Sequence, residues 1–426
     1  MPSVLIKTSF SFSWKKDYFC NRNVQIIRLT NLISKPNKTA RVVIPLLLLL
    51  LSSQIYCRPI WISLYHNTQI QSVVVSAYNG PVTISEKDKT ILSLETGKAV
   101  YISRSGDKLW MSDTDGFIGF YSRLSVSGAD SSIVVRVKPA MPQIESRNYE
   151  ETVLIYSDID RLRLINQIDE ERYLSGVVEA EVGAGKTGEF YKAKAVICRT
   201  YLYGHINRHA SEGFHLCDET HCQAYKGQCR HSDLIRTSVF NTRGIILTDR
   251  KESKPILAAY HSNCGGETES AKNAWQTDMP YLVPVSDPYC KSQPNARWQT
   301  VVSLDEWINC MIKNGFKPDP KTVTDFNFQQ LRRIPDYKVN KISIPTKQIR
   351  MDMKLRSSFF SVTIDKEKVI LDGKGYGHGV GLCQEGAMEM GRRGRKYDEI
   401  ISFYYKQVNL VPVSSLQIEV PEFKPE

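Results

Sequence analysis

Short apolar runs rich in β-branched residues recur over residues 60–145. Three of them, at 72–76, 99–102 and 132–137, have the length of a strand, and turn sequences containing Gly lie between the runs. Such runs bounded by turn residues are typical of β-strands. The pattern predicts a β-rich N-terminal region, and Pro139 and Pro142 predict a linker that ends it near residue 145.

After this region the chain mixes two hydrophobic periods. Some segments repeat apolar residues at helical spacing, and others contain strand-length apolar runs. The predicted helices are 170–181, 189–208, 303–315, 384–393 and 397–406. The predicted strands lie within 153–156, 162–166, 235–262 and 337–371. Together these elements predict an α+β fold with a β-rich N-terminal region.

An apolar run at 42–51 contains six consecutive leucines and follows a basic segment. A run of about ten apolar residues is shorter than a membrane span and fits the apolar part of a signal peptide. The alternative is a segment of a buried core. We expect residues 1–57 to be a leader and the protein to be exported to the periplasm or cell envelope.

Most of the positive charge belongs to this leader. The net charge is +11, and residues 1–57 hold eight Lys and Arg residues against one Asp, which leaves +4 for the remainder. A body that is so weakly basic does not favour a polyanion. We therefore expect no nucleic-acid partner, and membrane contact only through the leader. The ten cysteines are consistent with an oxidising compartment.

Glu181 continues an apolar helical stripe. Leu174, Val177 and Val178 lie at positions i, i+3 and i+4, and Glu181 falls at i+7 on the same face. A carboxylate in such a place is partly desolvated, which favours its protonated form and suits a general acid. The alternative is a carboxylate at a frayed helix end, because Gly183 follows closely.

Histidine and cysteine are concentrated between residues 209 and 231. Thiolates and imidazoles at this density suit tetrahedral zinc, although the spacing between Cys217 and Cys222 is wider than in a tight zinc knuckle. The alternative for an exported protein is a set of disulfides, and the residue pattern leaves both open. The members of the segment are His209, His215, Cys217, His221, Cys222, Cys229 and His231.

Two further segments carry polar chemistry. His261 and Ser262 are adjacent in a predicted strand and point to opposite faces, which argues against a serine nucleophile. Cys264, close behind them, is a candidate for a disulfide with Cys290. The glycine-rich segment 373–381 allows positive φ and close approach of another chain, so we expect a ligand groove there. Tyr376 and His378 would present their polar tips to that ligand.

Taken in order, these segments resemble the SpoIID/LytB family of stage II sporulation protein D and amidase enhancer. The resemblance spans roughly residues 165–410 and leaves out 60–145. The matching blocks are YLxGVVxxE at 173–181, KAxAVxxRTY at 192–201, DxxHCQAY at 218–225, HSxCGGxT at 261–268 with Trp275 and 280–282, and GHGVGLxQxGA at 377–387 with Tyr404 and Tyr405.

The resemblance implies peptidoglycan glycan strands as substrate and a lytic transglycosylase as activity. The family's catalytic Glu falls on Glu181, which agrees with the apolar stripe. One carboxylate would act twice, so the paired carboxylates of most glycosidases are not required. The implied substrate-binding residues are Arg199, Tyr201, His261, Ser262, Tyr376, His378 and Gln384.

The resemblance also implies a structural zinc site, because some members bind zinc through one His and two Cys. Cys217 and Cys222 match those cysteines, and His209 is the implied histidine. The spacing to His209 is longer here than in the family, which leaves His215 as a rival ligand.

Four segments are expected along the chain, and two functions remain in competition. The segments are a leader at 1–57, a β-rich region at 58–145, a SpoIID/LytB-like domain at 146–415 and a tail at 416–426. The first function is cleavage of MurNAc–GlcNAc bonds. The alternative is a non-catalytic wall-binding protein that activates a cell-wall amidase, as the amidase enhancer side of the family implies.

Overall fold

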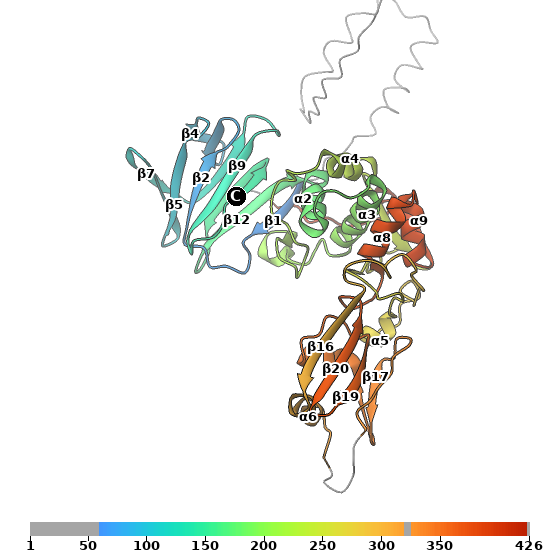
Figure 1. The fold of residues 1–426 in the computed structure, drawn as a ribbon. Coiled ribbons are helices and arrows are strands. Elements are labelled where there is room, and N and C mark those ends of the chain that lie inside the picture. The colour runs from blue at the N-terminus through green and yellow to red at the C-terminus, as the bar shows by residue number, and fades with distance from the viewer. Residues whose placement is uncertain (1–58, 319–324, 424–426) are drawn as a thin grey trace, which may run out of the picture. The chain divides into compact units, whose positions relative to one another are not determined.

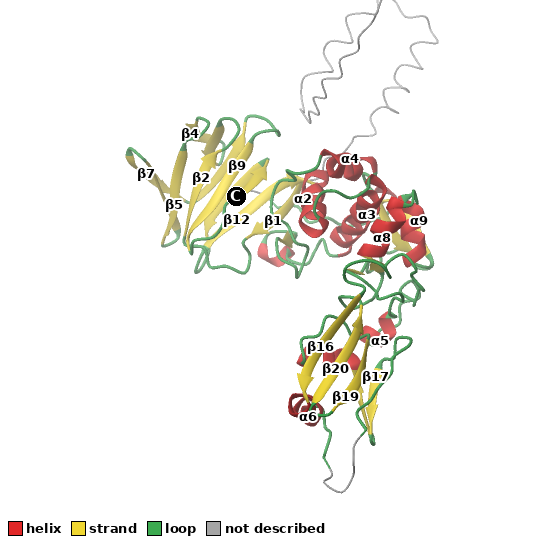
Figure 2. Cartoon of the chain, viewed as in Figure 1, coloured by secondary structure: helices red, strands yellow, loops and turns green. Residues whose placement is uncertain are grey.

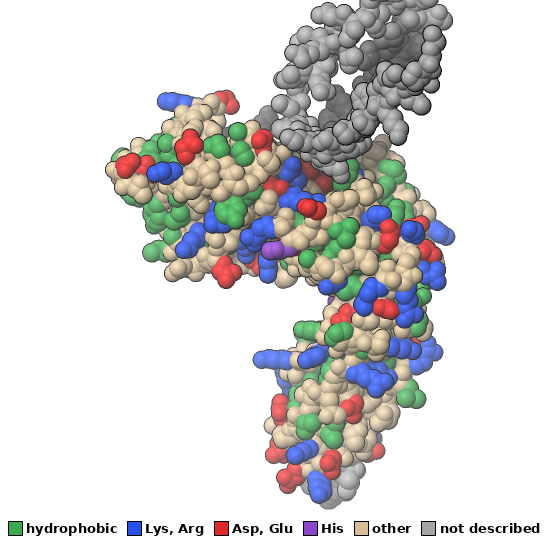
Figure 3. All heavy atoms as spheres, turned by 45° about the horizontal axis from the view of Figure 1, so that its top comes forward, with side chains coloured by type: hydrophobic (Ala, Val, Ile, Leu, Met, Phe, Trp, Pro, Cys, Tyr) green, Lys and Arg blue, Asp and Glu red, His purple; other side chains and the backbone are tan. Residues whose placement is uncertain are grey.

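The computed structural model describes residues 59–318 and 325–423. The predicted leader lies outside these ranges, so export stays a prediction. In the described part of the chain, no helix is long and apolar enough to cross a membrane. Both basic and acidic side chains lie on the face shown in Figure 3.

The predicted β-rich region consists of two mostly antiparallel sheets (Figures 1 and 2) that share one apolar core. Val75, Ile102, Val126 and Ile155 are among the buried residues of this core. One sheet has the order β13 (Leu216–Cys217), β1 (Pro59–Leu64), β12 (Leu162–Asp169), β11 (Thr152–Ser157), β8 (Arg123–Gly128), β3 (Val82–Glu86) and β4 (Lys89–Leu94). The other has the order β10 (Arg147–Glu150), β9 (Val134–Met141), β2 (Ser72–Ala77), β5 (Ala99–Ser105), β6 (Lys108–Asp113) and β7 (Gly116–Tyr121).

The expected boundary at residue 145 falls inside these sheets. β10 pairs with β9, and β11 lies between β8 and β12, so residues 147–169 belong to the N-terminal sheets. Pro139 is inside β9 and marks no linker. A proline is tolerated there because β10 pairs only with Val134–Val137 and the β2 register shifts beside Pro139.

The helices that follow are held by polar caps. α2 (Glu170–Val182) begins where the Asp169 side chain accepts hydrogen bonds from two backbone N–H groups, and α3 (Gly188–Gly204) begins at the Thr187 hydroxyl. α3 also contacts α4 (Asp233–Asn241), α8 (Gln384–Arg392) and α9 (Tyr397–Tyr404). These elements confirm the helices predicted at 170–181, 384–393 and 397–406, while the helix predicted at 189–208 ends at Gly204.

Two helices occupy segments predicted as strands. The prediction at 235–262 was wrong for α4, where Ile235 and Val239 are buried at helical spacing and the Ser232 side chain caps the start. The rest of that segment contains β14 (Ile245–Asp249) and β15 (Tyr260–His261). The prediction at 337–371 missed α7 (Thr346–Asp352), which is too short for hydrophobic period to reveal.

Residues 297–374 build a second apolar core of their own. Trp307, Tyr337, Val362 and Leu371 are fully buried in it. The core is formed by β16 (Arg297–Ser303), β20 (Lys368–Lys374) and β19 (Phe360–Asp365), the hairpin β17 (Asp336–Val339) and β18 (Ile342–Pro345), α6 (Leu304–Lys313) and α7. α6 confirms the helix predicted at 303–315.

The glycine-rich segment packs against the chain itself. Gly375, Gly377, Gly379 and Gly381 all have positive φ. A Cβ on Gly375 would lie 2.5 Å from the Asn263 carbonyl oxygen, and one on Gly381 would lie 2.0 Å from that of Ala259. The predicted close approach is therefore present, but residues 259–265 occupy the place that we expected for a ligand.

We expect Gly381→Ala to lower the free energy of unfolding by much more than Gly394→Ala does. Both glycines have positive φ, +71° and +80°, but a Cβ on Gly394 meets nothing within 4 Å. Gly394→Ala should lower the free energy of unfolding by about 1–2 kcal/mol, the usual cost of left-handed backbone. Gly381→Ala adds a backbone clash and should lose distinctly more in urea unfolding. Equal losses would contradict the close packing.

Candidate functional site

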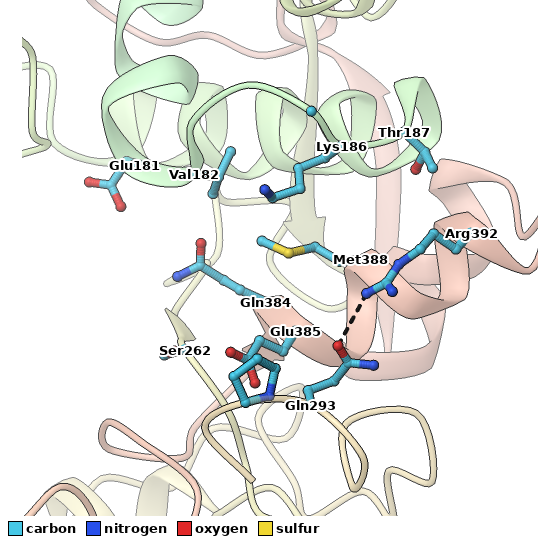
Figure 4. A pocket seen from close by; sticks show the side chains of 12 residues that line it. Glu181, Val182, Lys186, Thr187, Ser262, Gln293, Gln384, Glu385, Met388 and Arg392 are labelled. Atoms are coloured by element: carbon cyan, nitrogen blue, oxygen red, sulfur yellow. Dashed lines mark hydrogen bonds between the residues drawn. The ribbon is translucent and has the colours of Figure 1, made fainter.

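A pocket of about 560 Å³ opens between the end of α2 and the start of α8 (Figure 4). Its volume lies within the range of about 300–1,000 Å³ that is usual for ligand sites. Eight of its twelve lining residues have polar or charged side chains, which can form hydrogen bonds with a hydroxyl-rich ligand. The lining residues are Glu181, Val182, Gly185, Lys186, Thr187, Ser262, Gln293, Pro294, Gln384, Glu385, Met388 and Arg392.

Glu181 reaches this pocket from the last turn of α2. Leu174, Val177 and Val178 on the same face are fully buried, and the Glu181 side chain is 15% exposed, as the apolar stripe predicts. The backbone N–H of Ala224 donates to Oε1 over 3.4 Å. The Gly183 N–H donates to the Glu179 carbonyl, so the helix is still hydrogen-bonded around Glu181 and is not frayed there.

A buried lysine lies beneath this carboxylate. The Lys194 side chain is fully buried, and its ammonium nitrogen is 3.7 Å from Glu181 Oε2. The nitrogen also lies 2.9 Å from the centre of the Tyr260 ring, and no described residue accepts a hydrogen bond from it. Loss of solvation lowers the pKa of Lys194 from its ordinary value. Glu181 is thus the acidic group nearest to an otherwise unsatisfied cation.

Ser262 and Gln384 face Glu181 from a short parallel strand pair. β15 pairs with β21 (Leu382–Cys383), with Tyr260 opposite Leu382 and His261 opposite Cys383. Ser262 directly follows β15 and Gln384 directly follows β21, so this register brings both residues to the pocket. The Glu385 N–H donates to the Ser262 carbonyl oxygen over 3.0 Å, which joins the two strand ends.

Glu385 is a second carboxylate in the pocket and was not among the residues predicted from the sequence. Asn263 Nδ2 donates to Oε2 over 2.6 Å, and Asn295 Nδ2 donates to Oε1 over 2.6 Å. These amides fix both oxygens of the carboxylate as hydrogen-bond acceptors. Its only signal in the sequence was its position beside Gln384.

Four metal-ligating side chains converge in a second place. The ligand atoms of His209, Cys217, His221 and Cys222 all lie within 4.8 Å of one another. His221 Nδ1 is 3.3 Å from Cys217 Sγ, and His209 Nε2 is 3.5 Å from Cys222 Sγ. Zinc bonds of about 2.3 Å to sulfur and 2.0–2.1 Å to nitrogen require ligand separations of this size. The four residues therefore fit a tetrahedral zinc ion.

The surroundings distinguish the two rival histidines. His209 Nδ1 is 2.6 Å from Glu212 Oε1, which leaves Nε2 directed at the cluster. Such a carboxylate partner is typical of a metal-bound histidine. His215 uses both ring nitrogens elsewhere, with the Trp61 N–H at 3.0 Å and the Pro421 carbonyl at 3.0 Å. His215 therefore does not reach the cluster, and His221 is the fourth side chain that could bind a metal there.

Comparisons with known proteins match the part of the chain that contains the pocket and the His/Cys cluster. A family model described as SpoIID, stage II sporulation protein, matches residues 158–248, which include α2, α3 and the four ligands. An uncharacterized protein of Brachyspira hyodysenteriae is 30% identical over 281 residues, which cover 63% of this chain and 72% of that protein. The stage II sporulation protein D of Bacillus amyloliquefaciens is 28% identical over 271 residues, 59% of this chain and 76% of the relative.

The chain belongs to the SpoIID/LytB family. The amidase enhancer of Bacillus subtilis is 27% identical over 290 residues, which cover 56% of this chain but only 40% of the enhancer. The likeness to the enhancer therefore concerns less than half of that protein.

Several family-motif residues lie outside the pocket lining. Arg199 is fully buried, and its guanidinium pairs with Glu170 over 3.0 Å, with Glu171, and with the Thr242 carbonyl. We assign it a structural role in place of the expected substrate contact. Tyr201 is beside the metal-ligating cluster, where its hydroxyl donates to the His221 carbonyl over 3.1 Å.

The motif histidines fix the glycine-rich segment. His261 Nδ1 donates to the Val380 carbonyl over 3.0 Å, and His378 Nε2 donates to the Tyr260 carbonyl over 3.0 Å. Burial lowers the pKa of His378 to about 4, so its ring is neutral near pH 7. Tyr376 is 46% exposed and, like both histidines, does not line the pocket.

We expect two buried cations to differ sharply in their effect on stability. Arg199→Met leaves the buried Glu171 carboxylate without its partner, which should cost about 3–5 kcal/mol of unfolding free energy. Lys194→Met removes a buried cation for which no described residue is a hydrogen-bond acceptor. We therefore expect the free energy of unfolding to fall by no more than about 1 kcal/mol, or to increase. Urea unfolding of both variants is the measurement. Equal losses would contradict the assignment of Arg199 as the structural cation.

Proposed function

We propose that this protein is a peptidoglycan lytic transglycosylase that cleaves the MurNAc–GlcNAc bonds of glycan strands lacking stem peptides. The observation that carries the proposal is Glu181, a partly buried carboxylate above a buried ammonium, which opens into a polar pocket with Ser262 and Gln384. Kinship with proteins named for sporulation and for amidase enhancement supports a role at the cell wall.

Glu181 would act first as an acid. Its carboxyl proton goes to the glycosidic oxygen, and the bond from that oxygen to C1 of MurNAc breaks. The sugar develops positive charge at C1 while Glu181 becomes a carboxylate. The Lys194 ammonium, 3.7 Å away, and the Ala224 N–H then stabilise the new negative charge.

The same residue would act next as a base. The Glu181 carboxylate takes the proton of the MurNAc 6-hydroxyl, and that oxygen bonds to C1 to close a 1,6-anhydro ring. The carboxyl group is regenerated, and no water is consumed. Glu385 has no part in this scheme, because the amides of Asn263 and Asn295 hold its carboxylate.

Zinc is proposed as a structural cofactor held by His209, Cys217, His221 and Cys222. When bound, it would supply a rigid tetrahedral crosslink. Gln223 and Ala224 follow Cys222 directly, and the Ala224 N–H contacts Glu181. The crosslinked segment therefore positions a hydrogen-bond donor at the proposed catalytic residue.

We expect substitution of His209, but not of His215, to lower the zinc content of the protein. His209→Ala removes a cluster ligand and should lower the zinc bound per purified chain. His215→Ala is the matched control, because it alters a buried histidine of the same segment whose ring nitrogens lie against Trp61 and Pro421 and whose ring packs on Phe423, away from the cluster. Elemental analysis of both variants is the measurement, and loss of zinc in His215→Ala alone would contradict the assignment.

We expect Glu181→Gln to abolish cleavage of denuded glycan strands by the full chain. The amide keeps the shape of the side chain but has no proton of suitable acidity, and such a loss typically lowers rates by about 10²–10⁴-fold or more. Products are identified by mass spectrometry through their 1,6-anhydro-MurNAc ends.

Glu179→Gln is the control for this experiment. Its carboxylate lies on the same helix but accepts hydrogen bonds from the Arg230 and His231 N–H groups, away from the pocket lining. This variant should cleave at close to the wild-type rate. Wild-type cleavage by Glu181→Gln would refute the proposed role of Glu181.

A wall-binding amidase activator is the second candidate, favoured by the similarity to the amidase enhancer. An activator would bind the strands, leave them intact and stimulate a cell-wall amidase, and Glu181→Gln would not affect it. In either function the proposed location is the periplasm or cell envelope, to which the leader would direct the chain.

A further inference from the structure

A second cluster of metal-ligating groups lies behind the pocket and has no part in the proposed reaction. It consists of Cys264, Asp287, Cys290 and Cys383, all of them buried. The four ligand atoms lie within 4.8 Å of one another. From the sequence, Cys264 and Cys290 were candidates for a disulfide, and Cys383 had no predicted role.

The separations within this cluster suit a tetrahedral metal ion. Cys264 Sγ is 3.3 Å from Cys290 Sγ and 3.3 Å from Asp287 Oδ2. Zinc bonds of about 2.3 Å to sulfur and 2.0–2.2 Å to oxygen place neighbouring ligand atoms roughly 3.5–3.8 Å apart, so the side chains need to move by only about 0.5 Å or less to bind an ion. Soft thiolates together with one carboxylate select zinc or a similar thiophilic cation over magnesium or calcium.

Groups around the cluster stabilise negative charge on its ligands. The N–H groups of Cys264 and Gly386 donate to Cys383 Sγ over 3.3 and 3.4 Å. Asp287 Oδ1 accepts from the Tyr289 N–H over 2.8 Å, and Oδ2 accepts from the Tyr404 hydroxyl over 2.9 Å. Such outer hydrogen bonds are typical of metal-bound thiolates and carboxylates.

A buried cation and a helix terminus add to this stabilisation. Arg333 donates to the Cys264 carbonyl oxygen over 2.7 Å, which places its guanidinium beside the cluster. Cys383 is also the N-cap of the nine-residue helix α8, where the backbone favours negative charge.

Gly386 keeps the space beside the carboxylate open. A Cβ at this position would lie 2.3 Å from Asp287 Oδ2 and 2.3 Å from the Tyr404 hydroxyl oxygen. The cluster therefore depends on a residue without a side chain, as expected where ligands must converge closely.

A disulfide accounts for only part of this arrangement. It would join two sulfurs and leave the third thiol and the Asp287 carboxylate directed at an uncharged bond. A buried carboxylate without a cation is costly, whereas a divalent ion compensates both it and the thiolates. We propose that Cys264, Cys290, Cys383 and Asp287 form a second structural zinc site.

The proposed ion would fix the floor of the pocket. Cys264 lies two residues after Ser262, Cys290 lies three before Gln293, and Cys383 directly precedes Gln384. One ion would hold these three chain segments together, whatever reaction the pocket performs.

The test is the zinc content of the full chain, purified without chelator and measured by native mass spectrometry and elemental analysis. We expect two zinc ions per chain in the wild type and one in either His209→Ala or Cys383→Ser. Cys310→Ser is the matched control and should keep both ions, because Cys310 is a buried thiol that belongs to neither cluster. None of these readouts requires glycan cleavage, so failure of the proposed function would leave them unchanged.

A second measurement does not depend on the folding of a cysteine variant. In His209→Ala loaded with Co²⁺, the remaining ion should show intense thiolate-to-cobalt charge-transfer absorption, as expected for three sulfur ligands. The proposal is overturned if His209→Ala binds no metal. It is also overturned if denaturing mass spectrometry finds the chain two hydrogens lighter, with Cys264 and Cys290 joined.

Discussion

The pocket depends on the close approach of two backbone segments, 259–265 and 375–383. Their contact requires glycine, since a Cβ on Gly381 would lie 2.0 Å from the Ala259 carbonyl oxygen. It includes the parallel pairing of β15 with β21, which brings Ser262 and Gln384 to the pocket opposite Glu181. The same approach brings Cys264 beside Cys383. One packing constraint thus shapes both the pocket and the thiol cluster behind it.

Charge is distributed unevenly around this framework. Arg199 is buried with its guanidinium paired, so it stabilises the junction of α2 with α3 and α4. Lys194 is equally buried, and within the described ranges its one ion-pair partner is Glu181, at 3.7 Å. A buried cation without a hydrogen-bond acceptor is unfavourable for stability, and such costs are often retained at functional sites. This asymmetry supports Glu181 over Glu385 as the reactive carboxylate.

The sequence predicted the α+β fold, the main helices and the burial of Glu181, because hydrophobic period reports directly on which face of a helix is packed. The hydrophobic pattern did not reveal α7, which is too short to show a helical period. The segment of α4 was predicted as a strand. The glycine-rich segment suggested a ligand groove, because a sequence shows that backbone can approach closely but not what approaches it. Glu385 and Cys383 were missed, because their neighbours come from distant parts of the chain. His221 was noticed within the His- and Cys-rich segment, but the spacing did not show that it joins the two cysteines.

The role proposed for Glu181 is tested most directly by digesting denuded glycan strands with the full chain in water enriched in ¹⁸O. Ring closure by the MurNAc 6-hydroxyl consumes no water, so we predict anhydro-ended products without the heavy isotope. Products that carry one ¹⁸O at a reducing MurNAc end would instead indicate hydrolysis. That result would contradict the single-carboxylate mechanism of Glu181 and would require a second group, such as Glu385, to activate water.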